Sequence, residues 1–287
     1  MKRQLERADG SRLNAPLTAS ELASFEMYGY LVLPYSLNDI QLNELRDECD
    51  GLYGQTNADD LVELGCVLDI FASANRTPRS RVNVAEYVAF RNTLVGRPMS
   101  KDLQTLLFDE LPQLMQSLFH RPSVFFFNEH FVVKPPHSKV EFRWHQDDTE
   151  QLGMCVHREA IPWYISAWCA LDDVTATNGA LQFRHLDGES SPPVVVPAGK
   201  ILVFRSDVWH FSAANSSDAV RRAFYVQYSP TAITSRPLDH LPLCCALPVH
   251  HKATVEDSRC KKQAKLNTVD PTGNGEVSHD RGIITQD

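Results

Sequence analysis

Three side chains of metal-binding type form the most informative pattern in this chain. His145 and Asp147 make a His-x-Asp pair, and His210 follows 63 residues after the aspartate. Two imidazoles and one carboxylate on one side of a metal ion leave three coordination positions open, which is typical of non-haem Fe(II) oxygenases. The sequence therefore predicts an iron site whose open positions bind an organic co-substrate and dioxygen.

Arg221, eleven residues after His210, supplies a cation suited to the far carboxylate of a 2-oxo acid. Arg221 and Arg222 enter an extended segment, where side-chain alternation directs only one of them inward. A buried guanidinium needs an anionic partner and matches a carboxylate with two parallel hydrogen bonds. Ser212 shares the strand face of His210 and would add a hydroxyl to the same carboxylate. The alternative is that both arginines face solvent and have no part in the site.

The segment around the His-x-Asp pair must be extended for both side chains to point the same way. Gln146 then faces the opposite side, and it is a candidate for contact with the co-substrate only if the backbone twists. Asp148 would replace Asp147 as the ligand only in a bulged strand, so Asp147 is preferred. His210 must lie on a strand next to His145 in space. Short motifs are weak alone, and a chance match among eleven histidines is the alternative reading.

A helical N-terminal third precedes a region of many short strands. Capping residues and apolar spacing predict helices over 18–28, 38–53 and 103–119, with Pro112 marking a kink or break in the last. Period-two runs bounded by turn residues predict the strands, which cover 30–33, 124–127, 131–133, 164–171, 180–183, 194–196, 201–204 and 223–228. This pattern is typical of a double-stranded β-helix, the cupin-like jelly roll, with helices packed on one sheet.

The same pattern predicts a single domain over residues 18–245. Residues 1–17 are expected to form a flexible N-terminal arm. Residues 246–287 have too few apolar side chains to pack, and we expect a disordered polar tail. The segment 55–100 contains runs that fit either helix or strand and is left open.

Composition narrows the function classes. The chain has 287 residues, 43% of them apolar, with a formal net charge of −8. Its Lys and Arg residues are scattered, which argues against a nucleic-acid groove, and no apolar run approaches the roughly 20 residues of a membrane helix. The N-terminus lacks the apolar core of a secretory signal. Seven cysteines fit no disulfide frame, so we expect a cytoplasmic protein with reduced thiols.

Taken together, the order of several motifs resembles that of the phytanoyl-CoA dioxygenase-like proteins. The resemblance covers roughly residues 20 to 230, and the order and spacing of the motifs are more specific than any one of them. The matching segments are 25–33, 131–136, 144–147, 167–168, 177–181, 210–212 and 221–222. The resemblance implies a double-stranded β-helix that binds Fe(II) and 2-oxoglutarate and uses O2 to oxidise a small molecule, commonly by hydroxylation.

The resemblance also implies roles for individual residues. His145, Asp147 and His210 match the iron ligands, which bind the catalytic metal. Arg221 matches the residue that pairs with the distal carboxylate of 2-oxoglutarate, Ser212 its hydroxyl partner, and Trp168 a tryptophan that lines the co-substrate pocket. His130 falls at another pocket position, although the residue type differs. The family has a further upstream basic contact, for which Arg81 and Arg91 are the candidates.

The chain departs from the family pattern after its Asn-Gly turn. A Pro-Gly-Ser-His-like turn is usual there, whereas this chain has Phe183-Arg-His-Leu-Asp187, followed by a short insertion. That region commonly covers the substrate, so the departure puts an acyl-CoA substrate in doubt. It also suggests that the mouth of the substrate pocket is open. Trp144, Tyr164 and Trp209 would suit an apolar or ring-bearing small molecule at this mouth, or are ordinary packing aromatics.

Two other function classes compete with the oxygenase interpretation. One is a ligand-binding or sensing protein on the same fold without turnover, which would have no physical need for all three metal ligands. The other is a zinc hydrolase that uses the same three residues around a metal-bound water. A hydrolase needs a nearby general base and gives Arg221 no role, so it ranks last. The oligomeric state is not indicated by the sequence.

Overall fold

Two antiparallel sheets dominate the computed structural model of this chain, which describes residues 6–7, 16–56, 65–70, 83–147, 163–233 and 246–251. The large sheet has the strand order β1-β2-β8-β6-β10-β4-β11, with β3 also paired to β4, and the small sheet has the order β5-β9-β7. The expected jelly-roll architecture is confirmed. The strands are β1 (Glu6–Arg7), β2 (Tyr30–Ser36), β3 (Val67–Leu68), β4 (Ser123–Lys134), β5 (Phe142–His145), β6 (Ile165–Ala170), β7 (Leu181–Phe183), β8 (Lys200–Arg205), β9 (His210–Ser212), β10 (Arg221–Ser229) and β11 (Leu247–His251).

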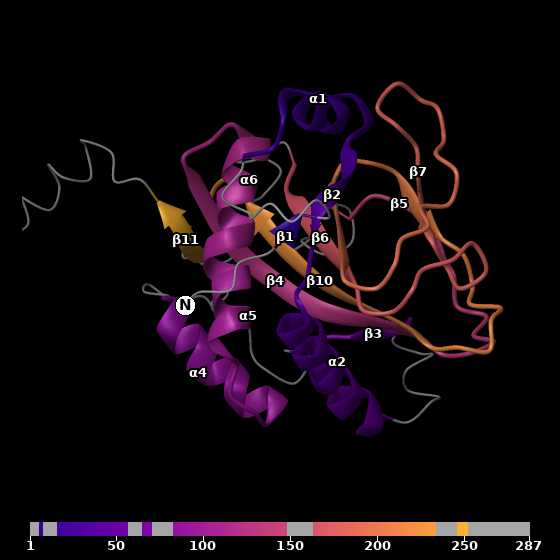
Figure 1. Cartoon of the computed structure of the whole chain (residues 1–287), viewed down its shortest axis with the longest axis horizontal. Coiled ribbons are helices and arrows are strands. Elements are labelled where there is room, and N and C mark those ends of the chain that lie inside the picture. Colours follow the sequence, from indigo (N-terminus) through magenta and orange to yellow (C-terminus); the bar gives the residue numbers. More distant parts are fainter. Residues whose placement is uncertain are drawn as a thin grey trace, which may run out of the picture. The chain divides into compact units, whose positions relative to one another are not determined.

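The described helices precede β4 in the chain, interleaved with β2 and β3. They are α1 (Ala19–Tyr28), α2 (Asp39–Gly54), α4 (Val84–Val95), α5 (Lys101–Thr105), a π-helical turn η1 (Leu106–Glu110) and α6 (Leu111–Phe119). In Figure 1, α4, α5 and α6 lie beside β4 and β11, whereas β5 and β7 lie on the other side of the molecule. No helix in the described ranges is long and apolar enough to cross a bilayer.

Helix ends follow the local sequence. Thr18 and Glu21 form a capping box at the start of α1, and Gly29 ends this helix with a φ of 77°. Such a left-handed residue is the usual stop signal of a helix. Pro112 lies in the first turn of α6, directly after η1. Its missing N–H is tolerated in a first turn, so the predicted irregularity takes the form of a π-helical turn before the proline.

Strand β10 shows how the sequence divides its residues between the two faces of the large sheet. Arg222, Phe224 and Val226 point to the helices, where Phe224 and Val226 join the main apolar core. Arg221 and Tyr225 point the other way, into the space between the sheets. Strand alternation therefore directs Arg221 and Tyr225 of this buried strand into the candidate site.

One continuous strand replaces two predicted ones. The expected strands 124–127 and 131–133 merge into β4, because the polar residues between them are paired rather than in a turn. Asn128 donates to Gln227 at 2.8 Å, and Glu129 accepts from Arg91 at 2.7 Å. His130 stacks on Tyr225 with ring centroids 4.7 Å apart. The polar residues between the two predicted strands are thus part of one strand in the interior of the molecule.

Two described strands lie outside the predicted domain of residues 18–245, one at each end. The expected N-terminal arm contributes β1, which pairs with β2, and the expected tail begins with β11, which pairs with β4. Backbone hydrogen bonds hold such edge strands, and these bonds leave no clear mark on composition. The compact unit that contains the described residues ends at His251.

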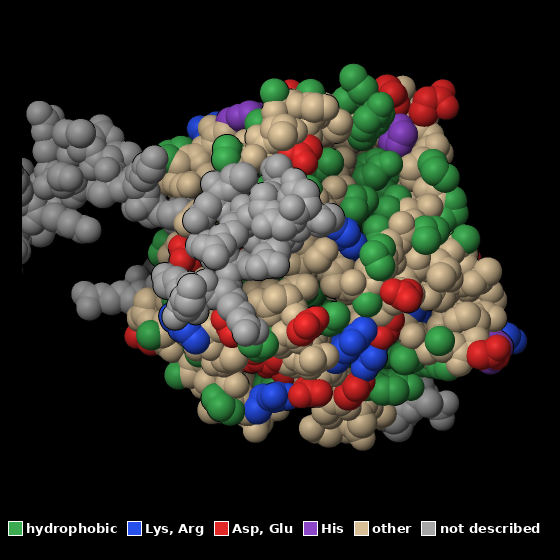
Figure 2. All heavy atoms as spheres, in the orientation of Figure 1, with side chains coloured by type: hydrophobic (Ala, Val, Ile, Leu, Met, Phe, Trp, Pro, Cys, Tyr) green, Lys and Arg blue, Asp and Glu red, His purple; other side chains and the backbone are tan. Residues whose placement is uncertain are grey.

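Surface charge is mixed on the face that Figure 2 shows, where Lys and Arg side chains are interspersed with Asp and Glu side chains. Arg222 lies at the boundary between α2 and β10. It forms ion pairs with Asp172 at 2.7 Å and Asp50 at 2.6 Å. Arg222 therefore ties the large sheet to α2, and it is not the simple solvent-facing arginine of the alternative reading.

Candidate active site

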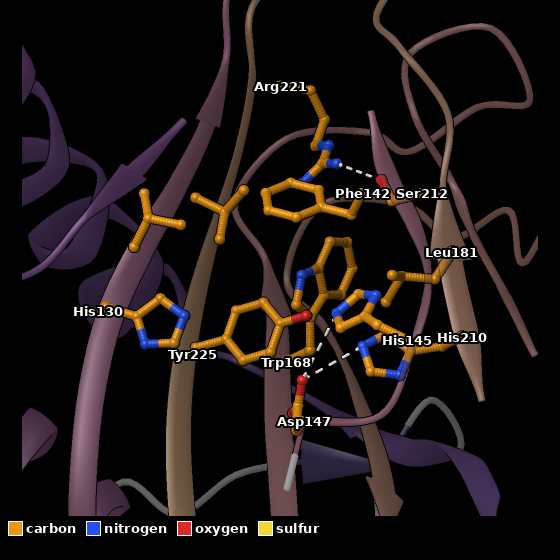
Figure 3. A pocket seen from close by; sticks show the side chains of 12 residues that line it. His130, Phe142, His145, Asp147, Trp168, Leu181, His210, Ser212, Arg221 and Tyr225 are labelled. Carbon is orange, nitrogen blue, oxygen red and sulfur yellow. Dashed lines mark hydrogen bonds and ion pairs between the residues drawn. The ribbon is translucent and has the colours of Figure 1, made fainter. Parts of the chain in front are cut away.

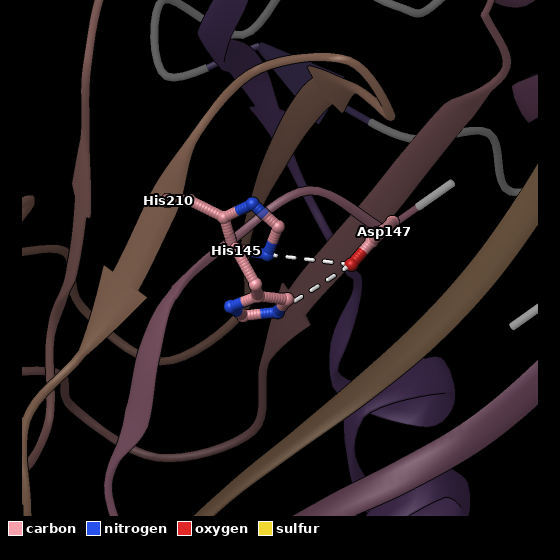
Figure 4. A group of neighbouring side chains, drawn as sticks. All are labelled: His145, Asp147 and His210. Atoms are coloured by element: carbon pink, nitrogen blue, oxygen red, sulfur yellow. Dashed lines mark ion pairs between the residues drawn. The ribbon is translucent and has the colours of Figure 1, made fainter. Parts of the chain in front are cut away.

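Three predicted metal ligands come together between the sheets. Strands β5 and β9 pair with His145 directly opposite His210, and the Asp147 carboxylate lies beside both rings (Figure 4). The Asp147 Oδ1 atom is 3.8 Å from His145 Nε2 and 3.3 Å from His210 Nε2. One ligand atom from each residue lies within 4.8 Å of the other two. This arrangement fits one small metal ion.

Asp147 reaches the site by a different route from the one predicted. Strand β5 ends at His145, so the alternation of strand side chains does not place the aspartate. The carboxylate is nevertheless 4% exposed and directed to both histidines. Asp148, the rejected alternative ligand, lies outside the described residues.

Hydrogen bonds fix which nitrogen of each histidine faces the metal position. His145 Nδ1 lies 2.6 Å from the carbonyl oxygen of Arg143, and His210 Nδ1 lies 3.1 Å from that of Val208. A carbonyl oxygen only accepts, so Nδ1 carries the proton in each neutral ring. Each Nε2 lone pair then faces the shared position, as in metal sites whose ligands are oriented by outer partners.

The second oxygen of Asp147 is held by two neutral side chains. Ser166 Oγ donates to Oδ2 at 2.9 Å, and Gln227 Nε2 lies 3.4 Å from the same atom. Burial raises the pKa of Asp147, but the charge that His210 carries when protonated, together with the hydrogen bonds from His210 and Ser166, outweighs burial, and the net pKa is lowered. The carboxylate is therefore ionised and oriented with Oδ1 toward the histidines.

Gln227 also connects Asp147 to the interior of the large sheet. Its Nε2 donates to Ser166 at 3.0 Å, and its Oε1 accepts from Asn128 at 2.8 Å. Asn128, Gln227 and Ser166 lie directly opposite one another on β4, β10 and β6. This row of polar side chains is the outer support of the metal site.

Replacing Gln227 with leucine is expected to weaken Fe(II) or Mn(II) binding by about 10- to 100-fold, the usual cost of losing an outer partner. The leucine keeps the volume but leaves Asp147 with one donor instead of two. Metal titration followed by calorimetry measures the change. Equal metal affinity for wild type and Gln227→Leu would remove this role.

One pocket joins the metal position to Arg221. It encloses about 130 Å³. In Figure 3, Arg221 and Ser212 lie at one end and Asp147 at the other, with Trp168 between them. The lining residues are Val67, His130, Val132, Phe142, His145, Asp147, Trp168, Leu181, His210, Ser212, Arg221 and Tyr225. The structure thus gathers the three ligands and four of the five predicted co-substrate residues into one cavity.

Arg221 is 1% exposed, and its hydrogen-bond partners are neutral. Its Nη2 donates to the Gly179 carbonyl at 2.9 Å and to Ser212 Oγ at 3.1 Å. Its guanidinium also lies over the Trp168 ring, 5.6 Å from the centroid. Burial lowers the pKa of Arg221 to about 10. A buried guanidinium with neutral partners is a site for an anion.

Gly179 is required at the turn that approaches Arg221. Its φ is 89°, and an added Cβ would lie 2.7 Å from the carbonyl oxygen of Ala213. The same Cβ would lie 3.2 Å from Arg221 Nη2. Glycine therefore permits both the left-handed backbone and the close approach of its carbonyl to the guanidinium.

Gln146 is the predicted co-substrate residue that the structure does not bring into the pocket. Its side-chain amide donates to the backbone carbonyl of Asp207. Three aromatics expected near the mouth also do not line the cavity. Trp144 stacks on Phe211, Tyr164 is buried against Phe127, and Trp209 is 42% exposed.

Lys134 is the main residue that the sequence interpretation missed. Its Nζ donates to Ser212 Oγ at 2.9 Å and to the Ser212 carbonyl at 3.0 Å. It also donates to the carbonyl of Ala213. Of the two basic residues considered instead, Arg91 is buried against Glu48 and Glu129, away from the pocket, and Arg81 lies outside the described residues. The sequence contained one signal for this residue, namely a lysine at the end of an apolar strand.

Tyr225 was missed as well. It lies four residues after Arg221 on the same face of β10, so strand alternation would have found it. Burial, and then the charge of Asp147, raise the pKa of Tyr225 well above its ordinary value, so its phenol is neutral. Together with His130 it forms the wall of the pocket opposite His145 and His210 (Figure 3).

Comparisons with solved structures agree with this architecture. The nogalamycin-biosynthesis epimerase SnoN, described as α-ketoglutarate dependent, is 17% identical with a TM-score of 0.55, covering 81% of this chain and 95% of its own. EctD from S. alaskensis, solved with 2-oxoglutarate and 5-hydroxyectoine, is 17% identical with a TM-score of 0.54, covering 75% and 77%. The non-haem monooxygenase ThoJ is 18% identical with a TM-score of 0.51, covering 81% and 84%. At such identities these similarities establish the fold.

Family membership rests on the sequence itself. No curated protein matches the chain at a significant level. The pattern of the family described as phytanoyl-CoA dioxygenase (PhyH) matches residues 25–223, which is more than half of the chain and spans all three predicted metal ligands. The chain therefore belongs to the phytanoyl-CoA dioxygenase family of non-haem Fe(II)- and 2-oxoglutarate-dependent oxygenases.

Proposed function

We propose that this protein oxidises a C–H bond of a small organic molecule, by hydroxylation or a related outcome, with Fe(II), 2-oxoglutarate and O2. The observation that supports this most is the pairing of two features in one cavity. His145, Asp147 and His210 form the metal-binding end, and Arg221 forms the other end. Among the described residues, no carboxylate forms an ion pair with Arg221, so this end is suited to an external anion.

The donor set fits Fe(II). Two neutral imidazole nitrogens and one carboxylate suit a divalent first-row metal and leave positions open for small ligands. When bound, Fe(II) and 2-oxoglutarate supply the reduction of dioxygen, with release of succinate and carbon dioxide and oxidation of the substrate. A retained Asp147 favours hydroxylation or desaturation, since it occupies the position that related halogenases leave for chloride.

Arg221, Trp168 and the metal ligands would position the co-substrate. Arg221 would bind its distal carboxylate, and Trp168 would form the wall beside its carbon chain. Ser212 has a more constrained part than the sequence suggested, because its hydroxyl already donates to the Gly179 carbonyl at 2.8 Å. It accepts from Arg221 and would orient the guanidinium. To donate to the carboxylate, it would have to turn away from Gly179.

The substrate is a small molecule of a class other than acyl-CoA in this proposal. The turn that departs from the family pattern packs against the end of α1 and the first residue of β2. His185 lies 4.7 Å from the Tyr28 ring and 5.7 Å from the Tyr30 ring, between centroids. This segment is occupied by contacts within the protein, and it carries no described basic cluster suited to the phosphates of coenzyme A.

Anaerobic absorbance tests the proposal directly. Adding Fe(II) and 2-oxoglutarate to the purified protein is expected to give a weak visible charge-transfer band, and admitting air should produce succinate without added substrate. A band without succinate would support the alternative, a ligand-binding or sensing protein on this fold. No band and no 2-oxoglutarate binding would overturn the oxygenase proposal. Comparison of metabolites with and without the active protein then identifies the substrate.

A further inference from the structure

Two buried basic side chains face each other at the Arg221 end of the pocket. Arg221 and Lys134 are direct cross-strand partners on β10 and β4, and both side chains are buried. Like charges directly opposite each other destabilise a sheet. Their nitrogens converge on one atom, since Arg221 Nη2 and Lys134 Nζ both donate to Ser212 Oγ, at 3.1 and 2.9 Å.

Only neutral acceptors surround Lys134 in the described part of the chain. Its three acceptors are one hydroxyl and two backbone carbonyls. No described carboxylate forms an ion pair with it, and its ammonium lies over the Phe142 ring, 4.9 Å from the centroid. Two positive charges would thus be buried side by side without a counter-ion, which is costly unless one is neutral or an anion is present.

We propose that Lys134 is a positioning residue for the distal carboxylate of the co-substrate and takes up a proton when this dicarboxylate binds. This inference rests on the proposed function, because it assigns the anion that balances the pair. Lys134 would act through its hydrogen bond to Ser212 and through its positive charge. It does not line the cavity itself.

The groups around Lys134 give the direction of the effect. Burial, and then the charge of Arg221, lower the pKa of Lys134 to about 7, while Cys66 and Glu141 raise it by smaller amounts. A carboxylate held in the cavity by Arg221 would lie near Lys134 and favour the protonated amine, so binding raises this pKa. Well below pH 7 the amine is protonated in both states and no proton is taken up. Above pH 7 the free protein must gain a proton to bind, so affinity falls as pH rises.

Calorimetry of the Mn(II)-loaded protein with 2-oxoglutarate tests this at pH 6, 7, 8 and 9. We expect the dissociation constant to increase by up to about tenfold per pH unit above pH 7, the limit for one linked proton. Titrations at pH 8 in two buffers of different ionisation enthalpy should show uptake of close to one proton. The analogue 2-oxopentanoate, which lacks the distal carboxylate, should bind weakly and without proton uptake.

Lys134→Gln removes the charge but keeps a donor, and Lys139→Gln is the matched control on an exposed lysine five residues away. Lys134→Gln is expected to bind 2-oxoglutarate more weakly with an affinity that no longer changes between pH 7 and 9. Lys139→Gln should behave as wild type.

Tight wild-type binding without proton uptake at pH 8 would overturn this inference and leave the proposed function standing. A pH dependence that persists in Lys134→Gln would also overturn it, by assigning the proton to another group such as metal-bound water. No binding of 2-oxoglutarate to the wild type would overturn the proposed function and the inference together.

Discussion

Replacing His145, Asp147 or His210 with alanine is expected to abolish 2-oxoglutarate turnover. Each change removes one of three ligand atoms that lie within 4.8 Å of one another. With only two ligands left, the metal is expected to bind more weakly and without the full set of two imidazoles and one carboxylate. Iron content and succinate production of each purified variant measure the effect. Wild-type turnover in any of the three would remove that residue from the site.

The fold should survive these changes, although stability will fall. Asp147→Ala leaves Ser166 and Gln227 without their acceptor, and an unsatisfied buried polar group typically costs about 1–3 kcal/mol. Circular dichroism therefore accompanies each assay. Asp148→Ala and His137→Ala are the controls and should retain activity, the latter because His137 is exposed and pairs with Asp218 at 3.0 Å.

The metal site was predictable from the sequence because its residue types and spacing match a known ligand set, although strand alternation did not place Asp147, since β5 ends at His145. His210 follows a strand and a turn, as its surroundings suggested, and the strand it begins pairs directly with that of His145. Arg221 was predictable because alternation in β10 forces one arginine of the pair inward. These inferences need only residue type, spacing and the period of a strand.

The position of Lys134 beside Arg221 could not be predicted, because it depends on the register between two strands and spacing in the sequence does not reveal register. Lys134 and Arg221 are 87 positions apart in the chain, and only the pairing of β4 with β10 places them opposite each other. The same pairing explains why Asn128, Glu129 and His130 continue a strand instead of ending it. Their partners come from β10 or from α4, and a local pattern contains neither.

Edge strands were missed for a different reason. Glu6–Arg7 and Leu247–His251 are held through backbone pairing with β2 and β4. Leu247 of the second strand is also fully buried in the apolar core, so the polar composition of the tail as a whole does not describe its first residues. Composition averaged over a long segment does not reveal a short strand added at a sheet edge.

Arg221→Ala is expected to weaken 2-oxoglutarate binding by about two orders of magnitude or more. Arg221 is 1% exposed, and removing one partner of a buried ion pair typically costs about 3–5 kcal/mol. About 1.4 kcal/mol corresponds to a tenfold change in affinity. Lys134 remains as a second positive charge, so binding should be weakened and still measurable. The affinity of the Mn(II) form for 2-oxoglutarate is the measurement, and Mn(II) binding itself should change little.

Arg222→Ala is the matched control, because the neighbouring arginine points to the other face of β10. Its ion pairs with Asp172 and Asp50 join the sheet to α2, so this variant should melt at a lower temperature with nearly unchanged 2-oxoglutarate affinity. A large affinity loss in Arg222→Ala alone would mean that the register of β10 is shifted by one residue. If neither variant loses affinity, the buried arginine does not anchor 2-oxoglutarate, and the co-substrate part of the proposal fails while the metal site stands. A loss of affinity in Arg221→Ala and a loss of stability in Arg222→Ala would show that one arginine binds the anion and the other supports the fold.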